Sequence, residues 1–303
     1  MAGSVGQDRA MAFPAPPVPD FKPEHAITSP WHLRYEDCAQ DGRLIPIAQP
    51  PMLAVLWQQL IHKHPGSRNA IASGIVPVLT RLTIESYDKP IRVDRAIEVR
   101  AGFELAHAIE HGEVARLFMN VWSEVRGMAG RVGPRQPEAD LVPAGRLFAE
   151  HQFTRLFAAP DQRRVTQLEV EGFPAVPEAR YEMLAPATAH DAPEGATWLD
   201  ELAIDPSPMV FSLDQTDANQ HVNSLVYVRV FIEAAQRRLA ARGVSLKLRT
   251  TAIDVTYRKP SFAGDRVHAH VRLYDRAGAP GAAGMIAGDD GKPRCYVRVQ
   301  FAP

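Results

Sequence analysis

The chain contains an internal repeat, which limits its fold more than any other feature of the sequence. The segment YDKPIRVDRAIEVR begins at Tyr87, and the related segment YRKPSFAGDRVHAHVR begins at Tyr257. Both read Tyr-x-Lys-Pro, then a short gap, Asp-Arg and an alternating pattern, at an offset of 170 residues (257 − 87). An offset of this length predicts two copies of one supersecondary unit within the 303 residues.

Each copy has the same predicted order of elements. In the first, residues 32–38 favour a strand, and residues 50–64 favour an amphipathic helix with prolines at its start, where they are tolerated. In the second, residues 209–217 favour a strand, and a helix over about 222–242 ends at Gly243. Segments rich in β-branched and aromatic residues follow each helix and predict further strands. One helix packed on several antiparallel strands is an α+β arrangement.

Composition divides the chain into segments. The predicted boundaries are a Pro-rich arm over 1–26, a first unit over 27–171, a linker rich in Pro, Gly and Ala over 172–207, and a second unit over 208–303. Within the first unit, residues 111–113 (HGE) predict a tight turn between two strands, and residues 130–145 predict a loop.

The overall composition is that of a globular protein with no strong electrostatic field. Hydrophobic residues make up 46% and charged residues 23% of the chain, and the net charge is −1 with a pI near 6.8. This balance argues against nucleic-acid and membrane partners. The two cysteines, Cys38 and Cys295, are far apart, and the N-terminus lacks a signal-type apolar run. We therefore expect a cytoplasmic protein, with a monomer and a homodimer both open.

The segment TDANQHVNSLVY (216–227) carries the strongest functional signal. An acid, two amides and an imidazole fall within seven positions, directly before a predicted apolar helix. Together with the basic segment Tyr257–Lys259, this run resembles the hotdog-fold acyl-ACP thioesterases. The residues that carry the resemblance are Asp217, Asn219, His221, Val222, Asn223, Tyr227, Glu233, Tyr257, Arg258 and Lys259. The resemblance implies a double hotdog: two tandem units, each with a long helix wrapped by an antiparallel sheet.

The resemblance also implies that thioester hydrolysis takes place at Asp217, Asn219 and His221. Asp217 would act as the general base on water, or attack the thioester carbonyl directly through an anhydride. Asn219 and His221 would position the water or Asp217, near the positive end of the helix dipole. Acids and amides before a helix are also ordinary N-caps, so a capping role stays open for them.

Other residues in the run have supporting roles. We expect Asn223 to be a helix cap or a hydrogen-bond partner of the central strand, and Glu233 to be a charge on the helix surface. Tyr257 and Ser261 are candidates for supporting or substrate-binding residues. Plant members of the family continue from Tyr-Arg-basic into an acid and a cysteine, where this chain has Pro260 and Ser261. That part of the family's site therefore does not carry over, although Ser261 could orient water.

The first unit is predicted to be non-catalytic. Its corresponding segment, CAQDGRLIP, has Asp41 but no asparagine or histidine beside it. His62 and His64 lie two residues apart on a predicted helix and therefore point to different faces, which argues against a metal site. No phosphate-binding glycine motif is present. We therefore expect no metal and no cofactor.

The predicted activity is hydrolysis of an acyl-ACP or acyl-CoA thioester to the free acid. Two alternatives remain open: a hotdog hydratase or dehydratase acting on acyl thioesters, and a non-catalytic protein that binds acyl carriers. The hydratase run has two residues between its asparagine and its histidine, whereas only Gln220 intervenes here. The basic segment 237–249 could dock an acidic acyl carrier or simply be a solvated helix end.

Overall fold

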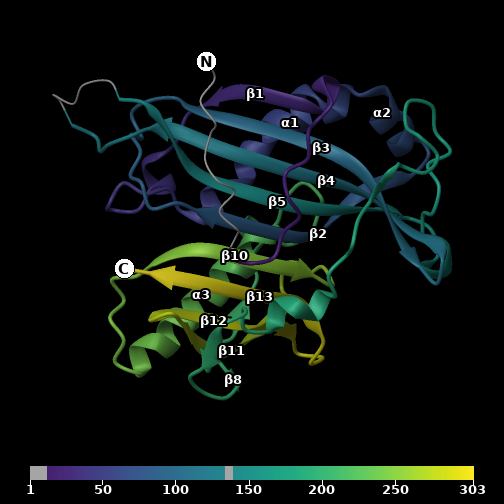
Figure 1. Ribbon diagram of the computed structural model, residues 1–303. Helices are drawn as coiled ribbons and strands as arrows, with labels where there is room; N and C mark the ends of the chain where they lie inside the picture. Colours follow the sequence, from purple (N-terminus) through teal and green to yellow (C-terminus); the bar gives the residue numbers. More distant parts are fainter. Residues whose placement is uncertain (1–11, 134–138) are drawn as a thin grey trace.

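The computed structural model describes residues 12–133 and 139–303, which contain one large, mostly antiparallel sheet and three α-helices. Figure 1 shows the two halves of the sheet one above the other. The first half holds, in spatial order, β1 (Ala26–Trp31), β3 (Ile97–Glu110), β4 (Glu113–Met128), β5 (Leu141–Arg155) and β2 (Ile75–Ser86). The second half continues with β10 (Arg249–Tyr257), β13 (Pro293–Ala302), β12 (Ala279–Gly288) and β11 (Arg266–Arg276).

Short strands complete both outer regions of the sheet. Strand β11 pairs with three of them: β7 (Ala196–Trp198), β8 (Ala203–Ile204) and β9 (Met209–Val210). Strand β6 (Ala179–Arg180) pairs in parallel with β3. The two halves meet where β2 pairs antiparallel with β10, with Thr83 opposite Asp254. The order of strands outward from this seam is therefore the same in both halves: a central strand, then three long antiparallel strands.

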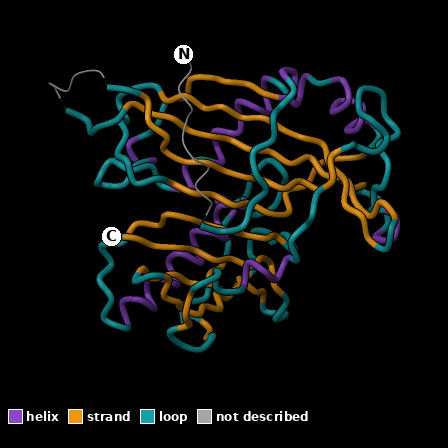
Figure 2. Tube along the Cα trace, in the orientation of Figure 1, coloured by secondary structure: helices purple, strands orange, loops and turns teal. Residues whose placement is uncertain are grey.

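The helices cover one face of the sheet. Helix α3 (Ser224–Ala241) packs against β11, β12 and β13, and α1 (Ala54–Gln59) packs against β1 and β3. Figure 2 shows these helices behind the strands of both halves. Side chains that alternate along the central strands, such as Leu82 and Ile84 on β2 and Ile253 on β10, face the helices and are fully buried. None of the helices in the described ranges is long and apolar enough to cross a bilayer.

The predicted long helix at 50–64 is wrong. Its place is taken by a 3₁₀ turn at Pro50–Leu53, the six-residue α1, and a second 3₁₀ turn at Ile61–Lys63; α2 (Pro65–Ala72) follows. Pro50 and Pro51 stand in the first 3₁₀ turn, and the helix stops at Leu60, whose φ of −123° and ψ of −65° leave the helical region. The helix predicted over 222–242 does form, and Gly243 follows it with a φ of 74°.

Several local expectations also change. Residues 32–38 contain a 3₁₀ turn at Tyr35–Asp37 instead of a strand, because the Asp37 carboxylate accepts a hydrogen bond from the backbone N–H of Arg34 (2.8 Å). The predicted strand over 209–217 shrinks to β9. The predicted loop over 130–145 is shorter, because β5 begins at Leu141; residues 134–138 lie outside the described residues. The turn at 111–113 is confirmed, with positive φ at His111 and Gly112.

Strand β12 was not expected from its sequence, APGAAGMIAG. Alanine and glycine are poor strand formers, so local propensity gives no strand signal here. The small residues are required by close neighbours. A Cβ at Gly281 would collide with the ring of Tyr274 on β11, and one at Gly284 would collide with the backbone carbonyl of His270. Tertiary packing therefore selects a strand that local propensity opposes.

The face of the sheet away from the helices carries the described part of the N-terminal arm and part of the 172–207 segment. Phe21 packs on Gly102 and on the ring of Trp122, and the Trp122 indole N–H donates to the carbonyl of Pro16 (3.2 Å). Residues 1–11 of the predicted arm lie outside the described residues. The 172–207 segment is not a free linker, because it contributes a 3₁₀ turn at Pro186–His190 and three of the short strands.

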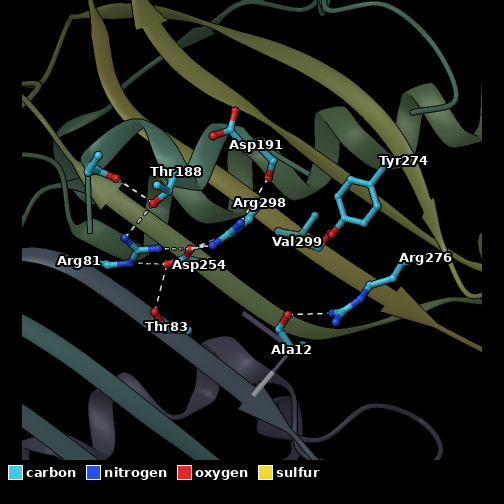
Figure 3. A network of polar contacts seen from close by, with 11 residues as sticks. Ala12, Arg81, Thr83, Thr188, Asp191, Asp254, Tyr274, Arg276, Arg298 and Val299 are labelled. Atoms are coloured by element: carbon cyan, nitrogen blue, oxygen red, sulfur yellow. Dashed lines mark hydrogen bonds and ion pairs between the residues drawn. The ribbon is translucent and has the colours of Figure 1, made fainter. Parts of the chain in front are cut away.

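A buried ionic network crosses the seam on this second face (Figure 3). The Asp254 carboxylate accepts hydrogen bonds from Arg81 Nε (2.9 Å) and Nη2 (2.6 Å), from Arg298 Nε (2.9 Å) and from the Thr83 hydroxyl (3.0 Å). Arg81 also donates to the hydroxyl of Thr188, in the segment that covers it (3.1 Å). One fully buried carboxylate from the second half thus joins two guanidinium groups, one from each half.

We predict that Asp254→Asn destabilises the protein by about 3–5 kcal/mol, because removing one partner leaves buried charges without compensation. The free energy of unfolding in urea measures this change. Glu201→Gln is the matched control. The Glu201 side chain is 92% exposed and its Oε1 lies 3.6 Å from Arg272 Nη2, so removing this ion pair should lower the stability by less than about 1 kcal/mol. Equal stabilities of Asp254→Asn and the parent would show that the network does not hold the seam.

Candidate active site

The loop that carries the predicted catalytic residues is a compact turn between a 3₁₀ turn at Leu213–Gln215 and helix α3. Thr216 and Val222 form an antiparallel bridge across its base. Inside it, the N–H of Asp217 donates to the carbonyl of His221 (3.0 Å), and the N–H of Gln220 donates to the carbonyl of Asp217 (2.9 Å). Gln220 has a φ of 66°, in the left-handed region. The backbone therefore fixes where Asp217 and His221 lie relative to each other.

Asp217 and His221 approach each other across this turn. Asp217 Oδ1 accepts a hydrogen bond from the backbone N–H of Asn219 (2.8 Å) and lies 4.0 Å from His221 Nδ1. The side chains of Asp217 and His221 are 28% and 41% exposed. The pair is therefore held in place while both side chains remain open to a substrate or water.

The third predicted residue is placed differently. The structure leaves Asn219 exposed, and its amide makes no hydrogen bond to any residue in the described ranges. Its contribution to the loop comes from its backbone N–H. The structure thus brings Asp217 and His221 together and does not bring the Asn219 side chain into the same contact.

Asn223 is the N-cap of α3. Its side-chain oxygen accepts from the N–H of Leu225 (2.9 Å), and its carbonyl accepts from the N–H of Val226 (3.0 Å). Its own N–H donates to the carbonyl of Gln215 (2.9 Å). Capping therefore occupies two of the N–H groups at the helix start. Glu233 lies exposed on the surface of the same helix.

Tyr257 and Ser261 hold the loop and the helix start to the sheet. The carbonyl of Ser261 accepts from the N–H of Val222 (2.8 Å), and the Tyr257 hydroxyl donates to the carbonyl of Ser224 (3.1 Å). The N–H of Ser261 donates to the hydroxyl of Tyr227 (2.8 Å). Ser261 itself is fully buried, and its hydroxyl has no partner among the described residues.

The anchoring role of Tyr227 was not predicted from the sequence, although this tyrosine belongs to the run that carries the family resemblance. Its ring is buried against Phe211 and Tyr257. Its hydroxyl reaches Ser261, 34 residues further along the chain. The position of Tyr227, four residues after the capping Asn223 and within the run that resembles the thioesterase family, was the feature of the sequence that could have indicated this role.

The first half repeats the backbone of this loop with different side chains. Cys38 and Leu44 form the antiparallel bridge, the N–H of Ala39 donates to the carbonyl of Arg43 (2.8 Å), and the N–H of Gly42 donates to the carbonyl of Ala39 (2.9 Å). These bonds match those of the Asp217 loop at an offset of 178 residues (217 − 39). Gly42 has a φ of 82°, as Gln220 has 66°.

The matching hydrogen bonds define which residue of the first-half loop is equivalent to each residue of the Asp217 loop. Ala39, not Asp41, stands at the position of Asp217. Asp41 stands at the position of Asn219 (219 − 41 = 178), and Arg43 stands at the position of His221 (221 − 43 = 178). The first-half loop therefore lacks both the carboxylate and the imidazole of the predicted reaction. Among the described residues, no cluster of three or more His, Cys, Asp or Glu side chains could hold a metal ion.

Comparison with known proteins identifies the fold. No protein-family profile matches the sequence, and no curated protein matches it. Solved structures do match it over nearly the whole chain, and three of them are described here. A protein assigned as an oleoyl thioesterase from Lactobacillus plantarum has a TM-score of 0.61 and 16% identity, over 91% of this chain and 95% of its own.

The other two structures agree with the first. An acyl-ACP thioesterase from Bacteroides thetaiotaomicron has a TM-score of 0.55 and 15% identity, over 91% of this chain and 98% of its own. The 12:0-ACP thioesterase from Umbellularia californica has a TM-score of 0.53 and 12% identity, over 92% of this chain and 97% of its own. The protein shares the fold of these structures, which confirms the resemblance predicted from the sequence at the level of the fold.

We predict that thiol-alkylating reagents leave the native protein unmodified near pH 7.5. Burial raises the pKa of the Cys38 thiol to about 11 and that of the Cys295 thiol to about 12, so both remain protonated and unreactive. Mass spectrometry after treatment with iodoacetamide, with and without urea, measures the labelling. Both thiols should be labelled only in urea. Rapid labelling of either thiol in the native protein would contradict this account.

Proposed function

We propose that the protein hydrolyses acyl thioesters, carried on acyl carrier protein or coenzyme A, to the free carboxylic acid. The observation that carries the proposal is the Asp217–His221 pair, held 4.0 Å apart in a turn directly before α3. The neighbours described above, which match over nearly the whole chain and bear thioesterase names, support the same reaction class.

We further propose that the fold is a tandem double hotdog, with units over 27–171 and 208–303 joined by 172–207. Three observations support this arrangement. The strand order is repeated on either side of the β2–β10 seam. The loop bonds recur at an offset of 178. At the same offset, the 18 residues of α3 correspond to residues 46–63, which form the broken helical segment of the first half.

In the proposed reaction, Asp217 removes a proton from water while the water oxygen bonds to the thioester carbonyl carbon. The resulting tetrahedral intermediate collapses by breaking its C–S bond, and the departing thiolate takes the proton, which leaves a carboxylic acid and a thiol. His221 orients Asp217 or the water, and the positive end of α3 favours the negative charge that develops on the oxygen. Direct attack by Asp217 through an anhydride remains the alternative route.

We predict that Asp217→Asn lowers kcat by on the order of 10² or more, because a neutral amide cannot serve as the base or the nucleophile. Free-thiol release from a panel of acyl-CoA and acyl-ACP substrates measures the effect. Stability should hardly change, since an asparagine oxygen can still accept from the N–H of Asn219. The matched control is Asp214→Asn, three residues earlier and exposed, which should keep the parent's turnover.

The same assay separates the alternatives. A hydratase or dehydratase, or a non-catalytic carrier-binding protein, would release no thiol from any member of the panel. A folded Asp217→Asn variant with the parent's turnover would exclude Asp217 as the reacting group while leaving thioester hydrolysis intact.

We predict that Ser261→Ala lowers turnover by less than about tenfold, because a neutral hydroxyl orients water but is a poor base. The substitution should not lower stability, since the buried hydroxyl has no partner among the described residues and its backbone bonds to Val222 and Tyr227 remain. Thiol release and urea unfolding of the variant measure both effects. A loss comparable to that of Asp217→Asn would place Ser261 in the reaction itself.

A further inference from the structure

A cavity of about 580 Å³ lies between the first-half loop and the far part of α3. Its walls come from residues 39–47 on one side and from α3 and residues 246–250 on the other. Gln236, on its wall, follows Ser224 by 12 residues, which is about 18 Å along the helix axis. The cavity is therefore distinct from the Asp217 loop at the start of the same helix, and its volume is in the range of roughly 300–1,000 Å³ found for small-molecule sites.

The loop that lines this cavity is the repeat of the Asp217 loop. It keeps the same backbone bonds but has Ala39 where the other loop has Asp217, and Arg43 where the other has His221. Such a loop can bind a ligand but has no carboxylate at the position that activates water in the proposed reaction. The cavity is therefore suited to binding without hydrolysis.

One end of the cavity is cationic. Three of its lining side chains are positively charged, Arg43, Lys247 and Arg249, and one, Asp41, is negatively charged. Arg249 is only 5% exposed; its Nη2 donates to Asp88 (2.7 Å), and its Nε lies 4.0 Å from the Asp41 carboxylate. Arg249 Nε and Nη1 have no hydrogen-bond acceptor among the described residues. Buried donors without an acceptor are costly, which points to a ligand or water oxygen at this end.

Aliphatic side chains from both halves also line the cavity, together with the polar Gln40, Gln236 and Thr250. Ile45 and Ile47 come from the first half, and Ile232, Leu248 and Ile253 come from the second. Ile253 is fully buried in the main core, so this wall continues into the apolar interior between the halves. Aliphatic side chains beside a cluster of Arg43, Arg249 and Asp41 fit a single-chain molecule that has an anionic head.

We propose that this cavity binds an aliphatic monocarboxylate, with its head at Arg249 and its chain against the isoleucines, and does not convert it. A monoanion fits better than a phosphate dianion, because Asp41 lies at the same rim and repels additional negative charge. The proposal does not depend on the chemistry of the Asp217 loop. A free acid of the kind released in the proposed reaction is one source of such a ligand.

The test is calorimetric titration with octanoate of the Asp217→Asn protein, with and without Arg249→Met. Losing a charged hydrogen-bond donor should weaken octanoate binding in this cavity by at least about tenfold. Octanoate that binds at the Asp217 loop binds there in both the single and the double variant. The difference in affinity between the two variants therefore measures binding in this cavity. The substitution should fold, because the Asp88 partner left behind is 69% exposed and can be solvated.

Lys247→Glu provides a second variant on an exposed side chain and should weaken binding by about fivefold. Lys22→Glu, on the exposed segment before β1, is the matched control and should bind octanoate like the parent. Octan-1-ol should show no dependence on Arg249, because it has no anionic head. Coincident octanoate isotherms for the parent, Arg249→Met and Lys247→Glu would overturn the proposal, as would an Arg249-dependent affinity for coenzyme A in place of octanoate.

The thiol-release assay tests the proposed hydrolysis independently of carboxylate binding in this cavity. Arg249→Met, with Asp217 intact, should hydrolyse acyl-CoA thioesters, which need no carrier docking, at the parent's rate. A parent protein that releases no thiol would contradict the proposed function, whereas the octanoate titration would still decide whether this cavity binds a carboxylate.

Discussion

The pairing of β2 with β10 is the constraint on which the rest of the structure depends. It makes one sheet from two halves, and the fully buried Asp254 holds it through Arg81 of one half and Arg298 of the other. Removing two guanidinium groups and a carboxylate from water is costly, and close, multiple hydrogen bonds offset that cost. Because these bonds are directional, they also favour the register in which Thr83 lies opposite Asp254. A slip of one residue would turn these charges into the apolar core.

This seam also decides what each loop faces. The first-half loop over 39–47 lies across from α3 of the second half, and a cavity forms between them. Neither half alone would enclose that space, since its walls come from both. The segments that cover the opposite face, the arm near Phe13 and the turn at Pro186–His190, pack over the ionic network and keep it from water (Figure 3). The N-terminal arm and a turn from the middle of the chain thus help to hold the centre of the sheet.

The two loops show how one backbone can support two different sets of side chains. The bridge across the base, the internal hydrogen bonds and the left-handed residue recur in both, at Gln220 and at Gly42. These features satisfy backbone groups locally and place few demands on the side chains. Asp217 and His221 in one loop, and Ala39 and Arg43 in the other, therefore change the chemistry without changing the turn. The helix after each loop differs more: the first-half segment starts as 3₁₀ turns around Pro50 and Pro51 and is interrupted again at Leu60, while α3 continues for 18 residues.

The sequence by itself determined the features that depend on neighbouring residues. The spacing of Asp217, Asn223 and the apolar positions after them set the loop and the cap of α3, and His111–Gly112 set the turn between β3 and β4. The repeat at Tyr87 and Tyr257 indicated two related halves, because a duplicated strand pattern survives in the local sequence.

Only the tertiary structure decided the features that depend on contacts between distant segments. It selected β12, whose alanines and glycines are poor strand formers, because the Tyr274 ring and the His270 carbonyl leave no room for larger residues. It showed that Ala39, and not Asp41, corresponds to Asp217, since that correspondence lies in hydrogen bonds and not in residue identity. It brought Asp254 to Arg81, 173 residues away, and left Arg249 at the rim of a cavity. Local sequence carries no record of such contacts, because burial and charge pairing are set by whichever surfaces the folded chain brings together.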